Sequence, residues 1–164
     1  MENFNGLNFR KFVESDIDCF TKIMKRAFDK DAQIHLGEEE GGPDGYDNGK
    51  FLKKWYLQKS STAFAVFKDD KPIGAINVWI KKDNINFLGN TFVDPDFQDK
   101  GIGLIIWQFI EQKFPETKAW RTETPGFSHR NHNFYINKCG FKLCYIKNPK
   151  DIRESSYLLE KIMK

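Results

Sequence analysis

The residues best suited to chemistry lie in a short turn between an apolar strand and an apolar helix. Segment 92–104 contains Gly101 and Gly103 at the point where the helix is expected to begin. Free backbone N–H groups at a helix N-terminus point outward, and the helix dipole favours negative charge there. Glycine has no Cβ, so a backbone that contains it can approach an anion closely. This combination predicts a cradle for a pyrophosphate group.

Two common nucleotide-binding motifs do not fit this turn. A dinucleotide-binding fingerprint requires a third glycine at position 106, where this chain has Ile106. A P-loop requires Gly-Lys-Ser/Thr after four spacer residues, and the segment has no such string. A bare Gly-x-Gly pair also occurs in ordinary turns, so the wider string must decide what the turn binds.

That wider string resembles a cofactor motif of one enzyme family. Val93, Pro95, Gln98, Gly101 and Gly103 are spaced as in the coenzyme A-binding segment of the GNAT family of N-acetyltransferases, usually written Gln/Arg-x-x-Gly-x-Gly/Ala. In that family the turn amides hold the coenzyme A pyrophosphate, and the preceding strand end pairs with the pantetheine arm. The resemblance implies acetyl-coenzyme A as cosubstrate, bound by strand-end and turn residues: Phe92, Val93, Gln98, Asp99, Lys100, Gly101, Ile102, Gly103 and Leu104.

A second motif supplies a candidate catalytic acid. Segment 134–141 resembles the family's Phe-Tyr-x-x-x-x-Gly-Phe string, in which the tyrosine lies beside the coenzyme A sulfur. Tyr135 occupies that place. A tyrosine O–H there would protonate the departing thiolate, and such acid catalysis is worth about a hundred- to ten-thousand-fold in rate. The alternative is a packed tyrosine with no part in catalysis.

The chain departs from the family pattern just before this tyrosine. Members often carry Asn seven residues earlier, where it contacts the coenzyme, and this chain has Ser128. Arg130 matches a frequent family residue, whereas Asn131 stands where alanine is usual. We expect Ser128, Asn131 or Asn133 to make the coenzyme contact that the missing Asn would make.

The general base is not where the family most often has it. Many members place a glutamate on the strand that leads into the glycine turn, but segment 86–91 contains no acid. Glu123, at the end of the strand that follows the long helix, is the base that we predict. The other candidate bases are Glu38, Glu39 and Glu40, and Asn90 is a candidate for orienting a water molecule. For each of these residues an ordinary solvated surface residue is the alternative.

An acidic loop indicates the charge of the acceptor. Segment 37–49 holds Glu, Asp, Gly and Pro with little to bury, which is typical of a mobile loop. Its charge would suit a cationic amine such as a polyamine, an aminoglycoside or a lysine side chain, although a solvated loop has the same composition. His129 and His132 are three residues apart but no third ligand stands out, so we predict no metal site.

The remaining pattern predicts the elements that position these residues. Strands are expected at 7–12, 62–67, 73–80, 85–93, 118–123, 141–146 and 155–162, and helices at 15–28, 50–56, 103–114 and 128–139. We therefore predict a single α/β domain over residues 1–164, with a mixed central sheet of about seven strands flanked by about four helices.

Composition excludes several other classes of protein. The net charge is only +3 with no basic stripe, so we expect no nucleic-acid partner. No apolar run would span a bilayer, and no signal peptide precedes residue 7, so a cytoplasmic protein is expected. The three cysteines are odd in number and lack CxxC spacing, which argues against a disulfide framework.

Other possibilities remain at this stage. The missing strand glutamate and the Ser128 replacement are also compatible with a catalytically silent protein that binds acyl-coenzyme A as a sensor or interaction module. Homodimerisation is common in the family. The last strands, with Tyr157, Leu158 and Ile162, would suit a shared sheet edge.

Overall fold

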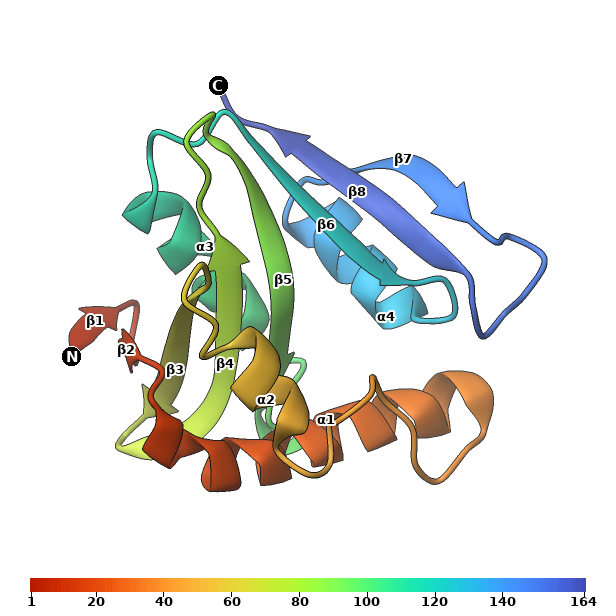
Figure 1. Cartoon of the computed structure of the whole chain (residues 1–164), viewed down its shortest axis with the longest axis horizontal. Coiled ribbons are helices and arrows are strands. Elements are labelled where there is room, and N and C mark those ends of the chain that lie inside the picture. Colours follow the sequence, from red (N-terminus) through yellow and green to blue (C-terminus); the bar gives the residue numbers. More distant parts are fainter.

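The computed structural model describes residues 1–164 and is built on one eight-stranded sheet (Figure 1). The strand order is β1-β2-β3-β4-β5-β6-β8-β7, and every neighbouring pair is antiparallel except β5 and β6. The strands are β1 Glu2–Phe4, β2 Leu7–Lys11, β3 Thr62–Lys68, β4 Lys71–Trp79, β5 Ile85–Val93, β6 Ala119–Pro125, β7 Lys142–Lys147 and β8 Ser156–Ile162.

Four α-helices accompany the sheet, and one of them continues as a π-helix. Two short 3₁₀ turns, η1 and η2, precede α1 and α3. The helical elements are η1 Glu14–Asp16, α1 Ile17–Leu36, α2 Lys50–Trp55, η2 Pro95–Phe97, α3 Ile102–Lys113, α4 His129–His132 and the π-helix η3 Asn133–Lys138.

The predicted α/β architecture is confirmed, with one strand more than expected. The additional strand β1 pairs with β2 through a tight turn at Asn5 and Gly6, whose φ angles are 48° and 87°. Two successive positive φ values define the hairpin turn that Asn-Gly favours, so the signal was present in the sequence. The expected edge position of the final strand was wrong, because β8 lies between β6 and β7.

The sheet buries a separate cluster of apolar side chains on each face. Alternation along β3 illustrates this, since Phe64 and Val66 join the cluster under α3 while Ala63 and Ala65 join the cluster under α1 and α2. The α3 side holds the larger rings, including Phe9 stacked on Phe109 at 3.8 Å between ring centroids. Small side chains on the other face let α1 lie close to the strands.

The pairing between β5 and β6 ends halfway along both strands. Their register runs from Ile85 opposite Ala119 to Leu88 opposite Thr122, after which the two strands continue apart (Figure 1). A bulge at Gly89 marks this point, because the pairing with β4 also shifts there. A Cβ on Gly89 would lie 2.1 Å from the Trp79 ring, so only glycine fits. The resulting gap positions the site.

Candidate active site

A pocket of about 240 Å³ lies beside the end of β5, beyond its last position paired with β6. Its walls come from α1, the end of β5, the glycine turn, α4 and the π-helix. The structure brings most of the predicted cofactor residues and the predicted acid into this one lining: Phe92, Val93, Gln98, Asp99, Gly101, Ile102, Gly103, Leu104, Asn131 and Tyr135. Lys100, Ser128 and Glu123 do not line it.

Glycine suits positions 101 and 103 of the turn for two different structural reasons. Gly101 caps α3 with φ of 78°, and a Cβ built on it would meet nothing within 4 Å. It therefore provides the left-handed backbone and an open approach to the first N–H groups of α3. A Cβ on Gly103 would lie 3.1 Å from the Phe134 ring, so this glycine allows α3 to pack against the π-helix.

An ion pair fixes where the turn begins. Asp94 is 1% exposed, and both its carboxylate oxygens accept hydrogen bonds from Arg26 of α1, at 3.0 and 2.6 Å. Burial alone would raise the pKa of Asp94, but the hydrogen bonds from Arg26 and from the Asp96 amide outweigh burial and lower it. Sequence reasoning missed this pair, although Asp94 before Pro95 is a typical start of a short helix.

Gln98 ties the turn to the strand and to α4. Its Nε2 donates to the Val93 carbonyl at 2.9 Å, and its Oε1 accepts from Arg130 at 2.9 Å. Arg130 lines the pocket beside the glycine turn and also lies 3.5 Å from Asp99. Lys100 points elsewhere, with its Nζ donating to the Asp96 carbonyl at 3.2 Å. Arg130 therefore lines the pocket beside the glycine turn, whereas the Lys100 ammonium group does not.

Tyr135 lies on the π-helix, a helix type that is frequent at functional sites. Its side chain is 7% exposed and lines the pocket, and its hydroxyl has no hydrogen-bond partner within the protein. Burial, and to a lesser degree the nearby Cys139, raise the pKa of Tyr135 well above its usual value. The phenol therefore keeps its proton at neutral pH and faces the pocket as a donor.

A second buried tyrosine comes from the opposite face of the sheet. Tyr56 is 2% exposed and donates its hydroxyl proton to Asn90 Oδ1 at 2.7 Å. Burial, together with the nearby Tyr135, raises the pKa of Tyr56 as well. The sequence makes Asn90 a candidate for orienting water, and the structure engages its side-chain oxygen with Tyr56.

Ser128 and Asn131 reach different partners. Ser128 is fully buried and its Oγ donates to Asp31 of α1 at 3.2 Å. Asn131 lines the pocket, and its Nδ2 donates to Thr124 Oγ1 at 3.1 Å, which ties α4 to β6. The Ser128 hydroxyl thus connects α4 to α1, while Asn131 keeps a place in the pocket wall.

Glu123 is the first residue of β6 beyond the last position paired with β5. Its carboxylate accepts hydrogen bonds from Lys147 at 3.2 Å and from Ser156 Oγ at 3.0 Å, both on the exposed face of the sheet. It therefore marks the point at which the two strands part, on a different side from the pocket lining.

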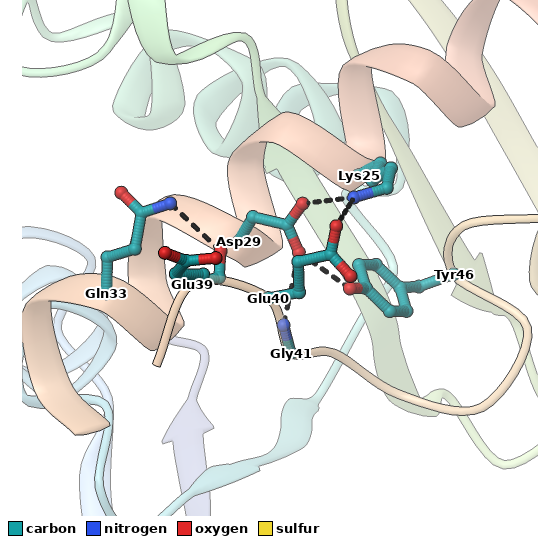
Figure 2. Close-up of polar contacts among 7 residues, drawn as sticks. All are labelled: Lys25, Asp29, Gln33, Glu39, Glu40, Gly41 and Tyr46. Atoms are coloured by element: carbon teal, nitrogen blue, oxygen red, sulfur yellow. Dashed lines mark hydrogen bonds and ion pairs between the residues drawn. The ribbon is translucent and has the colours of Figure 1, made fainter. Parts of the chain in front are cut away.

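The acidic loop between α1 and α2 is bound to α1 by Lys25, Asp29 and Gln33, whose Nε2 donates to the Glu39 carbonyl at 3.0 Å (Figure 2). Asp29 accepts hydrogen bonds from the Gly41 amide at 3.1 Å, from Tyr46 at 2.6 Å and from Lys25 at 2.6 Å. Lys25 also donates to Glu40 at 3.2 Å, as Figure 2 shows. These contacts oppose the mobility expected of the loop and neutralise part of its charge.

No group of three or more His, Cys, Asp or Glu side chains is arranged to hold a metal ion. Among the helices, none combines the length and the apolar character that crossing a membrane requires.

Comparison with known proteins identifies the family. The model of the acetyltransferase (GNAT) family matches residues 20–141. The chain belongs to this family. It is 35% identical to the uncharacterised protein YrkN of Bacillus subtilis over an alignment of 136 residues. This alignment covers 82% of this chain and 72% of YrkN.

Two solved acetyltransferases share the fold of this GNAT chain at low sequence identity. An acetyltransferase from Thermus thermophilus has a TM-score of 0.76 at 13% identity, covering 99% of this chain and 100% of that one. The PaiA N-acetyltransferase from Thermoplasma acidophilum, in complex with coenzyme A, has a TM-score of 0.71 at 18% identity, covering 96% and 99%.

Proposed function

We propose that this protein is an acetyl-coenzyme A-dependent N-acetyltransferase that moves an acetyl group directly to a primary amine. The observation that carries the proposal is one pocket that joins the open glycine turn at the α3 N-terminus to the buried phenol of Tyr135. A structural neighbour of the same fold was solved in complex with coenzyme A, which supports this choice of cosubstrate.

The residues of the pocket fit the cosubstrate. Gly101 leaves open space where a side chain would block the α3 amides, and Arg130 adds positive charge beside them, as a pyrophosphate requires. From Gly89 to Val93 the edge of β5 that faces β6 has no strand partner, so its backbone is free for a pantetheine arm. We assign oxyanion stabilisation to the amide of Phe92 or Val93.

Bound acetyl-coenzyme A supplies an acetyl thioester. In our proposal a water molecule relays the proton of the attacking amine to Glu123, whose carboxylate lies outside the pocket lining, and Tyr135 donates its proton to the sulfur as the C–S bond breaks and the C–N bond forms. Glu123 stands where β5 and β6 part, which motivates its role, and the raised pKa of Tyr135 keeps that donor protonated. Exchange with solvent then restores both groups, and no step needs a metal.

Release of the free coenzyme A thiol tests the activity. We would screen primary amines, including spermidine, kanamycin and a lysine-containing peptide, with acetyl-coenzyme A as donor. Turnover with one of these classes would support an acetyltransferase. Tight binding of acetyl-coenzyme A without turnover on any amine would favour the silent binding protein instead. A cytoplasmic location and a homodimer, formed through the last strands or the long helix α3, stay predictions.

A further inference from the structure

Most carboxylates around the pocket are matched to a cation. Asp94 pairs with Arg26, and Asp99 lies near Arg130. In the acidic loop and its anchor the pairs are Asp29 with Lys25, Glu40 with Lys25, and Glu38 with Arg153. These acids are therefore largely engaged in holding the fold, which leaves few of them to attract a cationic ligand.

Asp31 is the exception in the pocket wall. It lines the pocket from α1 with a side chain that is 18% exposed, and it forms no ion pair with lysine or arginine. One oxygen, Oδ1, accepts from Ser128 Oγ at 3.2 Å, while Oδ2 has no partner within the protein. The carboxylate is thus held in place by a neutral hydroxyl and is left without a full counter-charge.

A buried histidine next to Asp31 also lacks a hydrogen-bond partner, which is an independent observation about this part of the structure. The His35 side chain is 9% exposed, and its Nε2 is buried without a hydrogen-bond partner. This nitrogen lies 3.4 Å from Asp31 Oδ1, too poorly aligned to count as a hydrogen bond. Asp31 in the pocket wall and His35 next to it are each only partly satisfied, which costs free energy unless a further partner completes their hydrogen bonds.

The cations of the pocket wall and its carboxylate without a lysine or arginine partner come from different elements. Arg130 and Lys138 line it on the side of α4 and the π-helix, and Asp31 lines it from α1. The first pair suits phosphate groups, so the carboxylate on α1 is left to meet a different ligand of positive charge.

We propose that Asp31 determines acceptor specificity by binding a non-reacting ammonium group of the acceptor. The inference rests on the proposed acetyltransferase function and adds a substrate class, an amine that carries a second cation such as a polyamine. The reacting amine must be neutral to attack, so a carboxylate contributes most by holding a different ammonium group of the same molecule.

Asp31→Asn tests this role, because asparagine can still accept from Ser128 and differs from aspartate mainly in charge. Spermidine is titrated calorimetrically into the protein with and without bound coenzyme A, and butylamine serves as a probe that lacks the second cation. We expect Asp31→Asn to weaken spermidine binding by about 10- to 100-fold and to leave butylamine and acetyl-coenzyme A affinity unchanged. Asp18→Asn, at an exposed position of the same helix, is the matched control and should change neither.

The outcomes separate this inference from the proposed function. Equal losses for spermidine and butylamine, or a weakened affinity for acetyl-coenzyme A, would assign Asp31 to the fold or to the coenzyme and overturn the inference. Wild-type protein that binds acetyl-coenzyme A but not spermidine would overturn it as well. Failure of the wild type to bind acetyl-coenzyme A would instead contradict the proposed function, and the spermidine titration without coenzyme would still decide the role of Asp31.

Discussion

Replacement of Tyr135 by phenylalanine removes one hydroxyl from the pocket and almost nothing else. Because that hydroxyl has no partner within the protein, its loss should change the free energy of unfolding by no more than about 0.5 kcal/mol. If the hydroxyl protonates the leaving thiolate, kcat should fall by about a hundred- to ten-thousand-fold. Affinity for acetyl-coenzyme A should be nearly unchanged, since our proposal assigns pyrophosphate binding to the turn and Arg130.

Thiol release, calorimetry and urea unfolding measure these three quantities on the same preparation. Tyr46→Phe is the matched control, because it also deletes a largely buried phenol hydroxyl, but one bonded to Asp29 at 2.6 Å and outside the pocket lining (Figure 2). We expect this control to lose about 1.5–3 kcal/mol of stability and to retain kcat. A Tyr135→Phe variant with less than about threefold loss of kcat would refute the acid role.

The pH profile provides a further check on Tyr135. A general acid is active in its protonated form, and its rate is lost as pH rises through its pKa. Since burial raises the pKa of Tyr135, the wild-type kcat should show no decline from this group up to about pH 10. A decline below that pH that disappears in Tyr135→Phe would contradict the structure.

Other substitutions test the elements that position the pocket. Asp94→Asn should cost about 1–3 kcal/mol at pH 7 by weakening the Arg26 pair. Because the pKa of Asp94 is lowered on folding, the wild-type advantage should be lost as pH falls below about 4, as urea unfolding at pH 7 and pH 3 would show. Gly89→Ala should destabilise by about 1–3 kcal/mol, since its Cβ would overlap the Trp79 ring, and urea unfolding measures this. Arg130→Gln should weaken acetyl-coenzyme A binding about tenfold, and calorimetry at low and high salt should show a smaller salt dependence.

The sequence was sufficient for the elements that follow simple periodicity. The alternation of β3 to β5 and the apolar run of α3 are local properties, and β5 was predicted with the bounds that the structure has. The strand β1 was missed because it is three residues long, although the Asn5-Gly6 pair is a sequence signal for its hairpin turn. Edge and interior positions were not predictable, because they depend on which strands pair across the sheet.

The residues of the candidate site also fall into those that the sequence predicts and those that only the fold brings together. Motif residues with fixed spacing, from Gln98 to Leu104 except Lys100 and at Tyr135, were found from the sequence and meet in one pocket. The partners that orient them were missed, because Arg26 and Asp31 lie on α1, far away in the chain. Only the fold brings Arg26 to Asp94, 68 residues later, and Asp31 to Ser128, 97 residues later.

Calorimetric titration with acetyl-coenzyme A, using wild type, Gly101→Asp and Gly101→Asn, tests the proposed cradle most directly. Both side chains tolerate the positive φ of Gly101, so the two variants share any steric effect and differ in charge. A unit charge about 5 Å from a phosphate charge costs about 3 kcal/mol at an effective dielectric constant of 20, and salt reduces this cost.

We therefore predict wild-type binding, with the Asp variant about 30- to 100-fold weaker than the Asn variant. Aspartate at a helix N-terminus favours the helix, so unfolding would not explain such a loss. Absence of binding by the wild type, or equal affinities for the two variants, would contradict a pyrophosphate cradle at this turn.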